Sequence, residues 1–131
     1  MMYREPSDSP WGLVVRCDTL CPGVYSVSTA GHGGIMAQID AARRLLSPEA
    51  QAVGFQAGGY LNFEEDCDAP VVLRELVDSG IIAPRTDNYF RPGEYEACID
   101  RSLQHWNPAY WQARQERLSV REAKAAKERE R

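Results

Sequence analysis

A chain of 131 residues, 44% hydrophobic and 26% charged, has the composition of one ordinary globular domain and is too short for two. No apolar run approaches the roughly 20 residues that span a bilayer, and the first ten residues lack the basic and apolar regions of a signal peptide. We therefore expect a cytoplasmic protein with no membrane contact, whose four cysteines are reduced thiols.

The net charge of −4 is unevenly distributed along the chain. Residues 112–131 carry seven basic and four acidic side chains, a net +3, which leaves −7 on residues 1–111. An acidic main domain is poorly suited to hold phosphates, so we expect no direct binding of nucleic acid by that part. A partner with a basic surface suits it better, whereas the oligomeric state stays open.

Three segments are predicted from these patterns. Residues 1–9 are polar and are expected to form a flexible lead. Residues 10–111 are expected to form a single α+β domain. Residues 112–131 become rich in Ala, Lys, Arg and Glu and are expected to form a charged helical tail.

Three short strands are predicted. Residues 11–16 and 23–29 are rich in β-formers, and the loop 17–22 between them contains Pro22, so a hairpin is expected. Residues 60–63 follow a Gly-Gly pair and give the third strand. The expected sheet is therefore small, antiparallel and about three-stranded.

Several helices are expected to pack on this sheet. Ser47, Pro48 and Glu49 have the order of an N-cap, a first-position proline and an acidic first turn, and Gly80 suits the position after a helix end. Apolar spacing and such caps predict helices at residues 36–46, 48–53, 65 or 68 to 79, 94–105 and from 110 onward, the last one long.

A glycine-rich stretch, residues 31–34, surrounds one of the two histidines. Its glycines permit positive φ and close backbone approach, so a turn with an accessible His32 is expected. An imidazole there suits acid–base or ligand chemistry, and the alternative is a structural turn whose imidazole bonds a neighbouring group. The Lys and Ser/Thr of a phosphate-binding loop are missing.

A second stretch, residues 64–68, contains four carboxylates in five positions. Either a helix N-terminus or a cation, from a metal or a partner's Arg or Lys, would offset their repulsion. As a metal site, His32, Glu65 and Cys67 are the candidate ligands for zinc. Cys67 could also act as a nucleophile with His32 as base, although the neighbouring carboxylates oppose a thiolate. The candidate partner-binding or ligand residues are His32, Glu64, Glu65, Asp66 and Asp68.

The two stretches together resemble a largely uncharacterised family of small domains found in phage, plasmid and integrative-element proteins. The resemblance covers about residues 10–111 and brings no catalytic mechanism with it. It implies a bacterial mobile element and supports treating both stretches as one site. The motifs that carry it are Pro10-Trp11-Gly12, Pro22-Gly23-Val24-Tyr25, Ser28-Thr29-Ala30-Gly31-His32-Gly33-Gly34-Ile35, Leu46-Ser47-Pro48-Glu49-Ala50, Gly59-Tyr60 and Glu64-Glu65-Asp66-Cys67-Asp68.

Two functions follow as expectations. The first is a binding protein that inhibits a host protein or nucleoprotein complex through a basic surface, as in anti-CRISPR or anti-restriction counter-defence. The second is a metal-dependent or Cys/His hydrolase that uses His32 and the carboxylates of residues 64–68. We expect the binding protein rather than the enzyme, because no complete catalytic constellation is present in the sequence.

Overall fold

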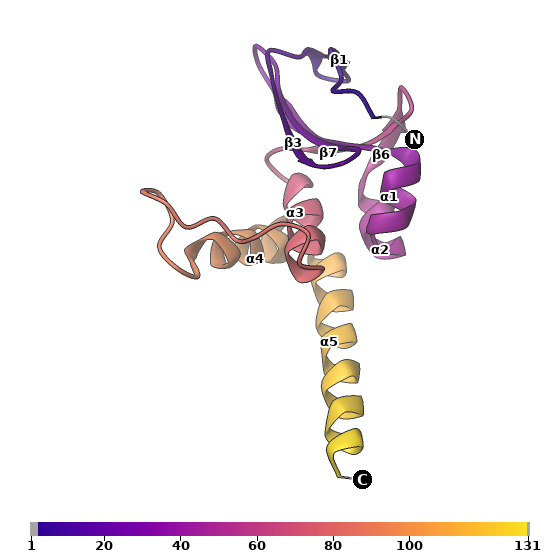
Figure 1. The fold of residues 1–131 in the computed structure, drawn as a ribbon, viewed down its shortest axis with the longest axis vertical. Coiled ribbons are helices and arrows are strands. Elements are labelled where there is room, and N and C mark those ends of the chain that lie inside the picture. Colours follow the sequence, from indigo (N-terminus) through magenta and orange to yellow (C-terminus); the bar gives the residue numbers. More distant parts are fainter. Residues whose placement is uncertain (1–2, 131) are drawn as a thin grey trace.

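The computed structural model, which describes residues 3–130, has a twisted antiparallel sheet with helices on one face and an N-terminal hairpin on the other (Figure 1). The sheet has five strands in the order β3-β4-β5-β7-β6, and β1 and β2 form a separate two-stranded hairpin. Their bounds are β1 Asp8–Ser9, β2 Gly12–Leu13, β3 Arg16–Cys21, β4 Val24–Ser28, β5 Gly33–Gln38, β6 Phe55–Ala57 and β7 Tyr60–Glu64.

The α+β class is confirmed, but the strand count is higher than the predicted three. The prediction of a sheet strand at residues 11–16 is wrong. Gly12–Leu13 belongs to the small hairpin, and the sheet strand begins at Arg16. Residues 17–22, expected as a loop, lie almost entirely in β3, and the turn that follows is at Pro22 and Gly23. This edge strand is largely exposed and polar, so it lacks the apolar pattern that marks a buried strand.

The glycine-rich stretch, residues 31–34, was expected as a turn, but half of it lies in a strand. Gly33 and Gly34 lie inside β5, and the reversal precedes them at residues 29–32, where the Thr29 amide donates to the His32 carbonyl at 2.7 Å. The helix expected from residue 36 begins at Ile39 instead. Residues 33–37 are buried in the central strand, and a short apolar run of this kind fits a buried strand as well as a helix.

Five helices cover one face of the sheet or extend from it, namely α1 Ile39–Leu45, α2 Pro48–Val53, α3 Ala69–Asp78, α4 Glu94–Trp106 and α5 Pro108–Arg129. The predicted cap at Ser47 is confirmed, because its side chain accepts a hydrogen bond from the Ala50 amide at 3.2 Å. Gly80 follows α3 with a φ of +72°, as its predicted place after the helix end requires. The long C-terminal helix is also confirmed, and its outer half extends away from the rest of the molecule (Figure 1).

Most of the core lies between the sheet and the helices, where Val24, Phe63 and Leu76 are fully buried. A smaller cluster on the opposite face contains Tyr25, Val27 and Met36, with Tyr3 and Trp11 packed against it. Of residues 1–9, expected as a flexible lead, residues 3–9 contain strand β1 and a tyrosine that packs against the sheet, and residues 1–2 lie outside the described residues.

Two adjacent charged residues of α3 are buried and connect the helices. Arg74, 3% exposed, donates to Asp78 at 3.1 Å, to Glu96 at 2.6 Å and to Asp100 at 2.9 Å, and so joins α3 to α4. These charge-assisted bonds satisfy a guanidinium that would otherwise be costly to bury.

Glu75 connects α3 to two other helices. Its carboxylate accepts from the Ser47 amide at 2.6 Å, from the Tyr110 hydroxyl and from Arg117 at 3.4 Å. Burial, together with the hydrogen bond from the Tyr110 hydroxyl to Glu75, raises the pKa of Tyr110.

Within residues 3–130, no helix has the length and apolar character that crossing a membrane requires.

Candidate functional site

The β5–β7 pairing brings the two sequence stretches together. Gly34 lies opposite Glu64, and the Glu65 amide donates to the Gly33 carbonyl at 3.1 Å. His32 immediately precedes β5 and Glu65 immediately follows β7, so antiparallel pairing places the two side chains at the same edge of the sheet. We call residues 29–32 the histidine turn and residues 64–68 the acidic turn.

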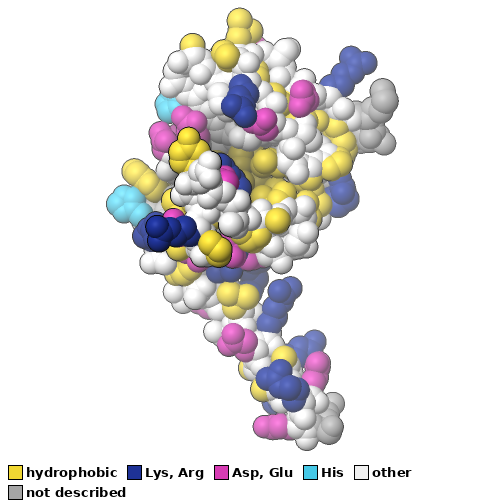
Figure 2. Space-filling view, turned by 60° about the vertical axis from the view of Figure 1, so that its left-hand side comes forward, with side chains coloured by type: hydrophobic (Ala, Val, Ile, Leu, Met, Phe, Trp, Pro, Cys, Tyr) yellow, Lys and Arg dark blue, Asp and Glu magenta, His cyan; other side chains and the backbone are white. Residues whose placement is uncertain are grey.

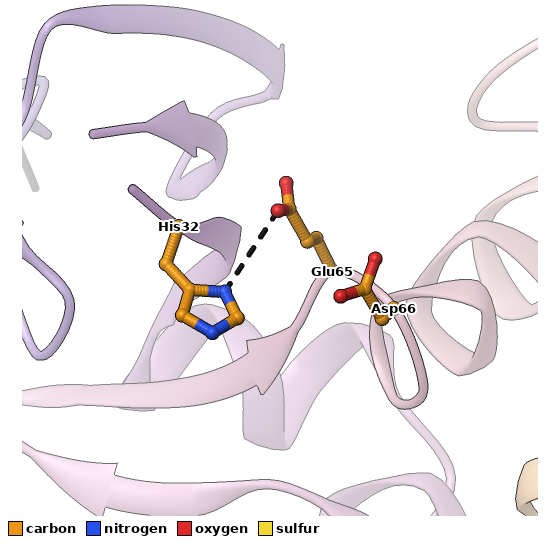
Figure 3. A group of neighbouring side chains, drawn as sticks. All are labelled: His32, Glu65 and Asp66. Atoms are coloured by element: carbon orange, nitrogen blue, oxygen red, sulfur yellow. Dashed lines mark ion pairs between the residues drawn. The ribbon is translucent and has the colours of Figure 1, made fainter. Parts of the chain in front are cut away.

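The shortest contact between the turns joins the imidazole to a carboxylate. His32 Nδ1 lies 3.9 Å from Glu65 Oε1, and both side chains are about half exposed (Figure 3). One ligand atom from each of His32, Glu65 and Asp66 lies within 4.8 Å of the other two. This is the only such potential ligand group found within residues 3–130. The structure thus forms a possible three-ligand group from the end of one turn and the start of the other.

Gly33 gives the Glu65 side chain room to reach this position. A Cβ at residue 33 would lie 2.4 Å from the Val27 carbonyl oxygen and 3.0 Å from Glu65 Oε2. The first of these distances is too short for any real Cβ, so only glycine fits without a backbone shift. The glycine is therefore required for close approach, and its φ is not positive.

The structure places Cys67 elsewhere. Its Sγ donates a weak hydrogen bond to Glu64 Oε2 at 3.8 Å, and Asp66 takes the third place in the group with His32 and Glu65. Burial, followed by the charges of Asp68 and Glu64, raises the pKa of the Cys67 thiol. A raised pKa leaves little thiolate at neutral pH, which weighs against Cys67 as a nucleophile.

The helix dipole accounts for few of these carboxylates. Helix α3 begins at Ala69, its first turn has no acidic residue, and the side chain of the N-cap residue Asp68 makes no capping bond. Asp68 Oδ1 instead accepts from Asn107 Nδ2 at 3.2 Å, while the same amide donates to the Cys67 carbonyl at 2.8 Å. These contacts span 40 and 39 positions, and no local sequence pattern indicates them.

The residue before Asn107 in the sequence, Trp106, has an exposed aromatic side chain. Trp106 is 55% exposed, and its ring meets that of His105 edge to face with centroids 4.6 Å apart. Figure 2 shows both histidine patches on one face of the molecule, with acidic side chains gathered against one of them. This face therefore combines acidic, basic, imidazole and apolar surface.

The fold and the site together define a small α+β domain with an exposed histidine–carboxylate group at one edge of its sheet. The chain belongs to the family described as "Domain of unknown function (DUF7007)", whose model matches residues 4–131. Comparison with curated proteins and with solved structures gave no match.

Proposed function

We propose that this chain is a binding protein whose acidic turn docks on a basic surface of a host protein or nucleoprotein complex and inhibits it. The observation that carries this proposal is the absence of a lysine or arginine ion pair, within residues 3–130, at any of Glu64, Glu65, Asp66 and Asp68. Several carboxylates elsewhere in the chain do have an arginine partner; Arg74, for example, pairs with Asp78, Glu96 and Asp100. A cation from a partner would offset the repulsion within the turn.

The neighbouring surface supports the same proposal. Protein interfaces are enriched in tryptophan, and exposed indoles are frequent centres of binding energy. Trp106 is connected to the acidic turn through the hydrogen bonds of the adjacent Asn107. A partner that pairs with the carboxylates and extends over the end of α4 would also cover this ring. The resemblance of the motifs to mobile-element proteins favours counter-defence, of the anti-CRISPR or anti-restriction kind, among the possible host targets.

Neutralising the four carboxylates of the acidic turn to their amides should abolish inhibition. We expect the wild-type chain, expressed in a bacterium with CRISPR or restriction defence, to raise the plating efficiency of a targeted phage, and the neutralised variant to lose this effect. Binding of the chain to its host complex, measured after a pull-down from the host lysate, should also weaken as the salt concentration rises, because surface charges are screened over about 10 Å at 0.1 M.

A matched control separates the site from the overall charge. The same four-unit change can be made at exposed glutamates outside the site, and this variant should keep the effect. The control positions are Glu49, Glu116, Glu122 and Glu128. Equal activity of the two variants, or no effect of the wild-type chain on any defence system, would contradict the proposal.

The His32–Glu65–Asp66 group favours a second candidate, metal-dependent hydrolysis. An imidazole nitrogen and two carboxylate oxygens within 4.8 Å suit Zn²⁺, and three protein ligands would leave a position for a water molecule. This ligand set differs from the one expected from the sequence, since Asp66 replaces Cys67. Its half-exposed side chains would leave access for a substrate.

Replacing His32 by alanine should remove stoichiometric zinc binding, measured by calorimetry and by elemental analysis after dialysis. The other histidine offers a matched control, because His105 lies on α4 outside the ligand group. His105→Ala should retain one zinc ion per chain. Absence of zinc from the wild-type protein, or equal loss in both variants, would reject the metal site and leave the first proposal intact.

A further inference from the structure

Cationic side chains follow one face of α5, the helix whose outer half extends away from the rest of the molecule (Figure 1). Residues 112–130 carry six lysines and arginines and four glutamates. At 3.6 residues per turn, five of these cations fall within an arc of about 140° around the helix axis. We call these five residues the basic stripe, namely Arg114, Arg117, Arg121, Lys124 and Lys127.

The acidic side chains of the same segment lie mostly outside the stripe. Only Glu128 falls inside the arc, whereas Glu116 borders it and Glu122 and Glu130 lie on the opposite face. In a helix that is stabilised by its own ion pairs, a glutamate precedes a lysine or arginine by three or four positions. Neither Glu116 nor Glu122 has such a partner. The charges are therefore separated by face and are not paired along the helix.

The inner part of the stripe holds α5 on α3. Arg114 Nε lies 2.8 Å from Asp78 Oδ2, and Arg117 Nη2 lies 3.4 Å from Glu75 Oε2. The groove of about 830 Å³ that contains these pairs is lined by four arginines and four carboxylates, so its charge is balanced. The chain itself thus neutralises the base of the stripe.

The outer part of the stripe is not neutralised in this way. Arg121, Lys124 and Lys127 are exposed, and none of them forms an ion pair within residues 3–130. Together with Arg117, whose side chain is 43% exposed, they span about 15 Å along the axis. Like charges at a spacing of three or four residues destabilise a helix, and an anionic partner would replace this repulsion by attraction.

We propose that the basic stripe binds the phosphate backbone of a duplex nucleic acid. A DNA duplex carries one negative charge per about 1.7 Å of its axis, and each lysine or arginine that neutralises a phosphate releases condensed counterions. The main domain, residues 1–111, has a net charge of −7 and repels the same backbone, which confines the contact to the protruding helix.

The composition of the stripe favours a duplex over other polyanions. Residues 112–130 contain no aromatic side chain, so the bases of a single strand would find no surface on which to stack. An extended acidic peptide has one charge per about 3.5 Å at most, roughly half the charge density of the duplex. Because phosphate contacts do not depend on base identity, binding is independent of sequence. The stripe lies outside the acidic turn, so this proposal does not rest on the docking function and would remain if that function failed.

The test titrates the full chain into fluorescently labelled short duplexes of DNA and of RNA, with labelled polyglutamate as the acidic-peptide probe, and measures fluorescence anisotropy. At low salt, at least one duplex should bind with a Kd of about 10⁻⁴–10⁻⁶ M, and log K should fall against log salt with a slope of about −3. Polyglutamate should bind at least about tenfold more weakly. The relative affinities of the two duplexes identify the source of the backbone. Failure of both duplexes to bind, or equal binding of polyglutamate, would overturn the proposal.

Two variants with equal charge changes give the matched control. Replacing Arg121, Lys124 and Lys127 by glutamine should bring the salt slope close to zero and weaken binding at least about tenfold. Glutamine is a good helix former, so circular dichroism should show that α5 is retained. The control variant replaces three exposed arginines outside α5 by glutamine and should keep the affinity of the wild type for the duplex. Its positions are Arg4, Arg91 and Arg101. Unchanged binding by the stripe variant, or an equal loss in both variants, would contradict the assignment of the stripe.

Discussion

Replacing Arg74 by methionine should lower the free energy of unfolding by about 3–5 kcal/mol, a large fraction of the stability of a domain of this size. The substitution keeps most of the buried volume and removes only the charge and its donors. Asp78, Glu96 and Asp100, which are 30–40% exposed, then lose the guanidinium that donates to them and neutralises their charge, although Asp78 retains Arg114 at 2.8 Å. Urea denaturation followed by circular dichroism measures the loss.

Two further variants separate the cause from a simple packing defect. Arg16→Met breaks the pair with Asp18, whose two side chains are mostly exposed, and should change stability by less than about 0.5 kcal/mol. Adding Glu96→Gln and Asp100→Asn to Arg74→Met should restore part of the loss, because the unpaired carboxylates are then neutral. A triple variant no more stable than Arg74→Met would show that the guanidinium acts through packing instead.

The penalty of Arg74→Met should also shrink as the pH is lowered. Burial opposes ionisation of Asp78, but its hydrogen bond from Arg114 and the charge of Arg74 outweigh this and lower the pKa of its carboxyl. A group whose pKa is depressed by folding contributes its stabilisation above its unfolded pKa, near 3.9, and loses it as the pH falls through the folded value. The part of this stabilisation that Arg74 supplies is therefore lost below about pH 4, and the stabilities of the two proteins should approach each other there.

The elements with local signals were predictable from the sequence. Ser47 caps α2 and Gly80 follows α3, because cap chemistry depends on a few adjacent residues. The strand β4 and the long helix α5 follow from composition and spacing. The family resemblance supported treating the histidine and the acidic stretch as one site, and the structure places His32 Nδ1 3.9 Å from Glu65 Oε1.

The features that depend on distant partners were not predictable in this way. Arg74 and Glu75 lie in an ordinary helical sequence, where charged side chains are normally exposed, and all their partners except Asp78 lie 22 to 42 positions away. The edge strands β3 and β6 contain exposed or polar residues, so periodicity does not mark them. The group of neighbouring ligand-type side chains differs at one position from the set expected from the sequence, because the local backbone of the acidic turn decides whether Asp66 or Cys67 lies near His32.

Gly34→Ala should destabilise the protein by about 3 kcal/mol, the upper range for inserting one methyl group into a close-packed site. A Cβ at this position would lie 2.3 Å from the Phe63 carbonyl oxygen and 2.5 Å from Trp11 Cη2. The oxygen belongs to the backbone of β7, which is paired on both sides by β5 and β6, so relief requires a shift of the strand. The indole belongs to the N-terminal segment that covers the opposite sheet face, so its displacement exposes apolar surface.

Gly31→Ala, three residues earlier, isolates this effect. A Cβ there meets nothing within 4 Å, and the backbone φ of Gly31 is not positive. Both substitutions reduce the entropy of the unfolded chain equally, by an amount that stabilises compatible sites by about 0.4–1 kcal/mol. Gly31→Ala should therefore be neutral or stabilising, and the difference between the two denaturation midpoints measures the cost of the clash. Equal midpoints would mean that β5 and β7 adjust freely, and the sheet edge holding His32 and Glu65 would then be far less rigid than this pairing implies.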